Sequence, residues 1–152
     1  MENIVYYSSK NKEGQKTKID HAATVAGSVA AGAQVSAFAI GKHTYAANMD
    51  ILFLGCEVHG NGKIPGNFRN LLKKVDPTEV KHVALFSILK NGSVTAMQEA
   101  KSILEPKGVK ICEEEFSCKG ASSFRNKGCP TEEDFKKARE FGAAIISKYR
   151  NI

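Results

Sequence analysis

The sequence has few cysteines, and their spacing is not that of a metal site. Its four cysteines, at positions 56, 112, 118 and 129, form no Cys-x-x-Cys pair. Structural zinc sites use such pairs, so we expect no metal site. The chain also shows no secretory signal, because the apolar run at its start ends at Tyr7. Reduced thiols and a cytoplasmic location are therefore expected.

Long apolar runs are also missing. Residues 22–41 carry no charge and are about long enough to span a bilayer. They consist mainly of Ala, Gly, Ser and Thr with Gln34 among them, and they lack the Leu and Phe density of a lipid-facing helix. We expect no membrane span, and interpret this stretch as a buried helix followed by a buried strand.

What is present suits one globular domain over residues 1–152. The chain is 42% hydrophobic and 25% charged, which is enough for one core without metals or disulfides. The 22 Lys and Arg exceed the 16 Asp and Glu, giving a formal net charge of +6 and a pI near 9.1. This basic balance suits nucleic acid, an anionic ligand or a soluble surface. Aromatic residues are not interleaved with a basic stripe, so we do not expect nucleic-acid binding.

Short apolar runs alternate with helical patterns along the chain. Residues 3–7, 34–40, 51–56 and 82–88 have the length of strands buried on both faces of a parallel sheet, and 109–116 resembles a half-exposed edge strand. Helical patterns cover residues 19–32, with Gly32 as a stop signal, then 65–76, 94–108 and the segment after the cap candidate Thr131. This alternation predicts a doubly wound α/β domain that binds ligands at the carboxyl ends of its strands.

The loop after the first predicted strand could bind a phosphate. Its candidate residues are Ser8, Ser9, Lys10, Asn11, Gly14 and Thr17. Hydroxyls, glycine and free amides ahead of a helix can hold a phosphate dianion, and the lysines add attraction. An exposed loop without a ligand is an equally good interpretation, because no Walker or dinucleotide fingerprint is present.

Several segments resemble, in this order, those of the flavodoxin family. They are Ile-Val-Tyr-Tyr-Ser-Ser at 4–9, the residues at 14–19, Met-Asp-Ile-Leu-Phe-Leu-Gly at 49–55, Val-Ala-Leu-Phe at 83–86, Phe-Ser-Cys-Lys-Gly at 116–120, and the closing helix at 128–141. The resemblance covers nearly all of the chain. It implies a flavodoxin-like five-stranded parallel sheet of order 2-1-3-4-5, with helices on both faces, and flavin mononucleotide (FMN) as cofactor. The phosphate loop is longer than the compact loop of the family.

The resemblance implies that the flavin ring lies against the loops after the third and fourth strands. The cofactor-binding candidates there are Cys56, Glu57, Val58, His59, Gly60, Ser87, Ile88, Leu89, Asn91 and Gly92. His59 stands where the family usually places an aromatic side chain, and an imidazole offers less face for stacking than Tyr or Trp. An exposed loop histidine and a buried structural thiol are the competing interpretations of His59 and Cys56. Glycines in these loops, among them Gly55 and Gly62, would let the backbone approach a flat ligand.

Three functions remain open from the sequence. The leading one is an FMN-binding electron carrier, which needs no catalytic acid, base or nucleophile. The second is a small FMN-dependent reductase of quinone-like acceptors, and the third is an interaction module that has lost flavin. Flavodoxins that carry electrons are typically acidic, whereas this chain is basic. Its redox partner is therefore expected to present an acidic docking face.

Overall fold

A five-stranded parallel sheet forms the centre of the protein. The computed structural model describes residues 2–9, 20–42, 44, 46–59, 62–89, 96–121 and 128–150. The strands are β1 (Glu2–Tyr7), β2 (Ser36–Ala39), β3 (Met49–Val58), β4 (Val80–Leu89) and β5 (Phe116–Lys119). They pair in the order β2-β1-β3-β4-β5, and all neighbours are parallel. This confirms the predicted fold class and strand order.

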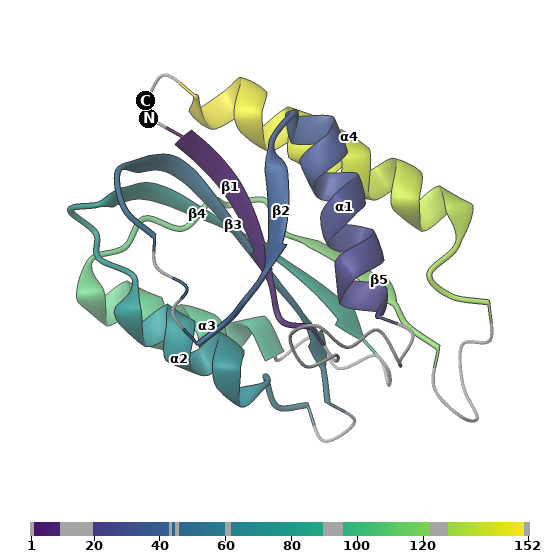
Figure 1. The fold of residues 1–152 in the computed structure, drawn as a ribbon, viewed down its shortest axis with the longest axis horizontal. Helices are drawn as coiled ribbons and strands as arrows, with labels where there is room; N and C mark the ends of the chain where they lie inside the picture. The colour runs from purple at the N-terminus through teal and green to yellow at the C-terminus, as the bar shows by residue number, and fades with distance from the viewer. Residues whose placement is uncertain are drawn as a thin grey trace.

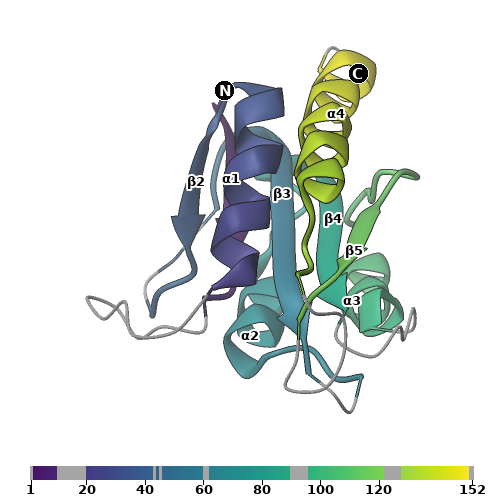
Figure 2. The ribbon, with the colours of Figure 1, turned by 90° about the vertical axis from the view of Figure 1, so that its right-hand side faces the viewer.

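Helices cover both faces of the sheet. Helices α1 (His21–Ala33) and α4 (Glu132–Tyr149) lie on one face, and α2 (Gly66–Lys74) and α3 (Ala96–Leu104) lie on the other (Figure 1). A short 3-10 helix, η1 (Glu105–Lys107), extends α3. Figure 2 shows the sheet turned by 90°, with the arrowheads of β2 and β3 pointing to the same lower edge. That carboxyl edge is where ligands of such sheets bind.

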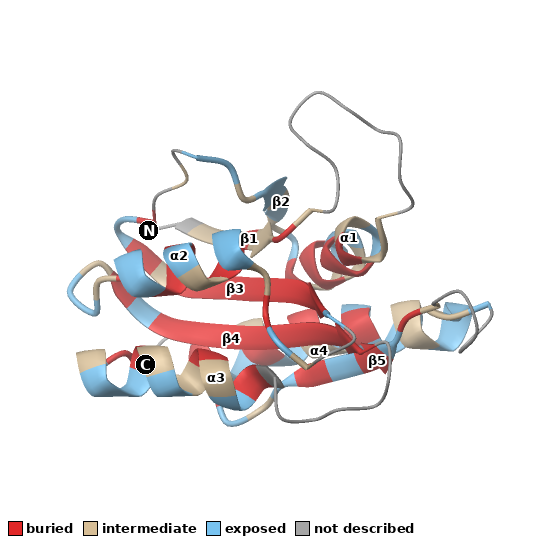
Figure 3. Cartoon of the chain, turned by 90° about the horizontal axis from the view of Figure 1, so that it is seen from below, coloured by how far each residue is buried: buried red, intermediate tan, exposed pale blue. Residues whose placement is uncertain are grey.

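The two central strands, β3 and β4, are buried along almost their whole length (Figure 3). Their side chains alternate between two core layers because successive residues of a strand point to opposite faces. Leu52, Leu54 and Leu85 pack on the side of α2 and α3, while Phe53 and Phe86 pack on the side of α1 and α4. This confirms the prediction that both strands are covered on both faces.

Strand β2 does not have the predicted burial. Three of its four residues are exposed, and the Phe38 side chain keeps 51% of its surface accessible. The expectation of a buried strand is wrong because β2 is the outermost strand, paired only with β1. An apolar run shows that a segment can be buried, whereas its place in the strand order decides whether neighbours cover it.

One predicted helix boundary is confirmed and another is corrected. Thr131 caps α4 in a capping box with Asp134, as the cap candidate and the acidic first turn predict. The predicted stop at Gly32 is wrong, because α1 continues to Ala33 and is capped by Gln34 in the left-handed region, with φ of 57°. Gly32 has another role. A Cβ there would lie 1.8 Å from the carbonyl oxygen of Arg139, so the absence of a side chain lets α1 approach α4.

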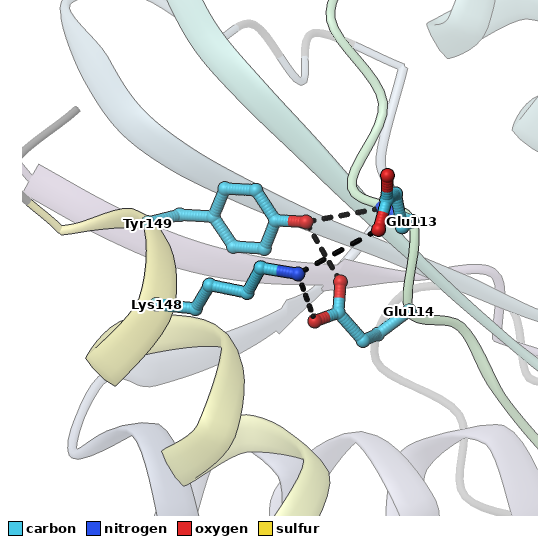
Figure 4. Close-up of polar contacts among 4 residues, drawn as sticks. All are labelled: Glu113, Glu114, Lys148 and Tyr149. Atoms are coloured by element: carbon cyan, nitrogen blue, oxygen red, sulfur yellow. Dashed lines mark hydrogen bonds and ion pairs between the residues drawn. The ribbon is translucent and has the colours of Figure 1, made fainter.

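The predicted fifth strand over residues 109–116 is also corrected. Ile111 makes only an isolated bridge with Val83, and β5 begins at Phe116. Glu113 and Glu114 interact with α4 instead: the Tyr149 hydroxyl donates to Glu114 Oε1 at 2.7 Å and accepts from the Glu113 N–H at 3.1 Å (Figure 4). Lys148 pairs with both carboxylates in the same view. These contacts give polar groups of Glu113 and Glu114 partners outside the sheet. The hydrogen-bond ladder with β4 therefore resumes only at Phe116.

Candidate functional site at the carboxyl edge of the sheet

The strand order reverses between β1 and β3, and this marks the candidate site. The chain passes from β1 to β2 on one side and then to β3 on the other side of β1. Connections that leave in opposite directions open a crevice outside the carboxyl ends of the two strands. Just past the end of β1, the Ser8 N–H donates to the Gly55 carbonyl of β3 at 3.0 Å. The segments that begin the predicted phosphate and ring loops therefore lie side by side.

The two serines of the predicted phosphate loop already have hydrogen-bond partners. The buried Ser8 hydroxyl donates to Asn67 Oδ1 at 2.6 Å, which ties β1 to the first turn of α2. The Ser9 hydroxyl donates to Asp20 Oδ2 at 2.5 Å, just before α1. Lys10, Asn11, Gly14 and Thr17 lie outside the described residues. Their assignment to a phosphate stays a prediction.

The predicted ring residues come together on paired strands. Cys56 is in register with Ser87, Glu57 with Ile88, and Val58 with Leu89. All six side chains are buried, in contrast to the exposed His59 that follows β3. Gly60, Asn91 and Gly92 lie outside the part of the chain that the structure describes. The structure therefore brings the described candidates to one edge, and their contact with a ligand stays a prediction.

Two glycines near this edge have different roles. Gly55 lies within β3, and a Cβ there would come within 1.9 Å of the Phe86 ring, so the absence of a side chain is needed for core packing. Gly62 has φ of 81° and closes a turn, in which its N–H donates to the His59 carbonyl at 2.8 Å. The His59 N–H donates in turn to the Lys63 carbonyl at 3.0 Å. These bonds hold the backbone of His59 at the rim of the edge.

Sequence reasoning named Glu57, Ile88 and Leu89 as site candidates but missed Gly120 and His21, which lie beside them. Gly120 follows β5, and its N–H donates to the Leu89 carbonyl at 2.9 Å. A Cβ on Gly120 would lie 2.5 Å from Ile88 Cγ2, 3.8 Å from Glu57 Oε1 and 3.9 Å from His21 Cδ2. The ends of β3, β4 and β5 thus meet the beginning of α1 around one buried carboxyl group. Only the tertiary fold shows this meeting, because the segments are far apart in the chain.

The Cys56 thiol at this edge is buried and has the character of a neutral, unreactive thiol. Burial raises the pKa of Cys56, and Glu57 and Glu99 raise it further, so the thiol stays protonated at neutral pH. This agrees with the interpretation of Cys56 as a buried structural thiol. Among the described residues, no group of three or more His, Cys, Asp or Glu side chains could hold a metal ion. Nor does any described helix combine the length and apolar character needed to cross a membrane.

The described residues fit a phosphate poorly. Both serine hydroxyls are donated to other side chains, and the Ala23 N–H in the first turn of α1 donates to Asp20 Oδ1 at 3.2 Å. A carboxyl group thus already occupies the end of α1 at which an anion would be received. Asp20 was also missed at the sequence level, although an acidic residue just before an apolar helical pattern is a known cap signal. Further donors to a phosphate would have to come from residues 10–19, outside the described part.

Comparisons with known proteins identify the fold. No family model and no curated protein matches the sequence. Among solved structures, a flavodoxin from the domain Archaea has 14% identity and a TM-score of 0.69, over 99% of this chain and 100% of that one. Oxidised flavodoxin 1 of Bacillus cereus has 17% identity and a TM-score of 0.70, over 97% and 99%. Two-electron reduced flavodoxin of Megasphaera elsdenii has 18% identity and a TM-score of 0.62, over 95% and 99%. The chain has the flavodoxin-like fold.

Proposed function

We propose that this protein binds FMN at the carboxyl edge of its sheet and transfers electrons between partner proteins. The observation that carries the proposal is the reversal of strand order between β1 and β3, with Ser8 hydrogen-bonded to Gly55 at that point. Sheets of this order bind ligands at their switch point, and flavodoxins bind FMN there. The similar structures support the proposal, since two of them are flavodoxins described in an oxidised and a two-electron reduced state.

The protein's own residues would bind the flavin and set its surroundings. When bound, the flavin ring supplies the capacity to accept and donate electrons. The rim residue His59 would lie against the ring, and the backbone at the ends of β3 and β4 would approach its edge. The phosphate would be received by the loop after β1, where the described donors are already in use and residues 10–17 would have to contribute.

The charge of the protein favours an acidic partner. The formal net charge is +6, and exposed lysines lie beside the proposed site: Lys63 after β3 and Lys119 at the end of β5. A basic rim around a redox centre steers association with a partner of opposite charge, and this steering weakens as salt rises. We therefore propose a redox partner with an acidic docking face.

A fluorescence titration tests the proposal, because the chain has no tryptophan of its own. The variant His59→Trp should place an indole at the rim, bind FMN more tightly than wild type, and lose its fluorescence as the flavin stacks on it. The matched control is Lys81→Trp, at an exposed position near the amino end of β4, on the opposite edge. Its FMN affinity should equal that of wild type and its quenching should be weaker.

Two outcomes would overturn this function. If wild type and both variants show no saturable FMN binding at micromolar concentrations, the electron-carrier proposal fails and an interaction module takes its place. If reduced, FMN-loaded protein turns over a quinone steadily without a protein partner, a reductase becomes the better assignment.

A further inference from the structure

Asp20 uses both of its carboxyl oxygens at the beginning of α1. Oδ1 accepts from the Ala23 N–H in the first turn at 3.2 Å, and Oδ2 accepts from the Ser9 hydroxyl at 2.5 Å. The carboxyl group therefore joins the end of the β1 segment to the start of the helix. It stands at the switch point where the proposed flavin site begins.

The position matters because the first turn of a helix attracts anions. Its N–H groups have no partners within the helix, and the helix dipole adds partial positive charge there. In α1 this attraction is already used by a carboxyl group that belongs to the chain. A phosphate dianion brought to the same turn would meet a like charge and one fewer free N–H.

The neighbours of Asp20 show that its charge reaches the end of β1. Burial raises the pKa of the Tyr7 phenol, and Asp20 raises it further. A second acid lies nearby on the same face of the sheet, because Glu57 is 4% exposed and both Glu57 Oε1 and His21 Cδ2 lie within 4 Å of the point where a Gly120 Cβ would stand. Two acidic side chains, Asp20 and Glu57, therefore lie near the α1 terminus, although the chain as a whole is basic.

We propose that Asp20 is a specificity-determining residue of the flavin site, an inference that rests on the proposed function. It keeps the flavin phosphate away from the first turn of α1. The phosphate then contributes less to the binding free energy than it would at a helix terminus without a carboxylate. The site therefore discriminates less between FMN and riboflavin than such a terminus would.

The variant Asp20→Asn tests this inference with little risk to the fold. Asparagine caps helices about as well as aspartate, so the first turn of α1 should stay intact, as urea unfolding can verify. Without the negative charge, FMN should bind roughly tenfold more tightly, the size expected for one charge acting on a nearby phosphate. Riboflavin has no phosphate, and its dissociation constant should not change. High salt should shrink the FMN effect, because a screened charge repels less.

The matched control is Asp76→Asn at the opposite edge of the sheet. Asp76 lies between α2 and β4 and accepts from the Thr78 N–H at 2.8 Å, a bond that asparagine can also make. The substitution removes the same charge from the protein while leaving the flavin edge unchanged. It should leave the affinities for FMN and riboflavin as they are in wild type.

The outcomes separate this inference from the proposed function. If Asp20→Asn changes FMN and riboflavin equally, leaves both unchanged, or weakens FMN, the inference is wrong while flavin binding stands. If neither flavin binds to wild type or to the variant, the proposed function fails and the inference fails with it. Tighter FMN binding by Asp20→Asn alone, reduced by salt, supports both.

Discussion

Replacing Gly142 by alanine should force α1 and α4 apart. Gly142 lies on the buried face of α4, and a Cβ there would stand 2.1 Å from the Val29 carbonyl oxygen and 3.0 Å from the Ala33 nitrogen of α1. Real Cβ atoms essentially never come closer than 3.0 Å to such neighbours. Both neighbours are backbone atoms of a helix, so no side chain can rotate away. The helices would have to separate by about 1 Å.

The energetic result follows from two opposing terms. Overpacking a tight interface costs about 1–3 kcal/mol, and a clash with rigid backbone belongs at the upper end of that range. Alanine gains about 1 kcal/mol over glycine in the interior of a helix. The expected net loss of stability for Gly142→Ala is therefore about 2 kcal/mol.

Gly27→Ala provides the matched control. Gly27 is exposed in the middle of α1, and a Cβ there would have no atom within 4 Å. Only the propensity term applies, so this variant should gain about 0.5–1 kcal/mol. Urea unfolding followed by circular dichroism should show a lower midpoint for Gly142→Ala and a higher one for Gly27→Ala, with equal slopes. A Gly142→Ala protein as stable as wild type would refute the proposed helix contact.

Three further predictions concern the phosphate loop, a buried histidine and a helix end. Thr17→Ala should weaken FMN but not riboflavin, by roughly 1.5–3 kcal/mol for a lost bond to a charged group, in fluorescence titrations; an equal effect on both would place the phosphate elsewhere. Burial lowers the pKa of His82 below its ordinary 6.5. Lys110 and Lys81 lower this pKa further, whereas Asp50 raises it. As the pH falls, the unfolded chain binds a proton at His82 before the folded protein does. The stability that neutral His82 contributes is therefore complete above about pH 6.5 and decreases as the pH drops toward the pKa of the folded state. The variant His82→Phe keeps a ring beside Tyr149, whose ring centroid lies 5.0 Å from that of His82. It should flatten the decline in stability when urea midpoints are measured from about pH 7.5 to about 5. An unchanged decline would mean that other groups cause it. Lys107 Nζ donates to the last-turn carbonyls of Leu72 and Lys73, so Lys107→Met should cost about 1 kcal/mol by urea unfolding, whereas the exposed Lys110→Met should cost less.

Local patterns in the sequence determined the elements whose partners are close in the chain. The α4 helix begins directly after its cap residue Thr131 because the capping box joins residues only three positions apart. Its buried face follows the helical period through Ala138, Gly142 and Ile145. The near-continuous apolar runs of β3 and β4 likewise determined their burial on both faces. The order of the segments, through their resemblance to flavodoxins, was enough to predict the strand order.

The tertiary structure decided whatever depends on residues far apart in the chain. It made β2 an exposed edge, turned Gly32 from an expected stop signal into a contact with α4, and drew Glu113 and Glu114 away from the sheet toward Tyr149. In the candidate site it joined Ser8 to Asn67 across 59 positions and put the Asp20 carboxyl group over the first turn of α1. A hydroxyl in a sequence shows that a hydrogen bond can form, and a glycine shows that two backbones can come close. The strands and helices that the fold brings beside each residue decide which hydrogen bond or backbone contact forms.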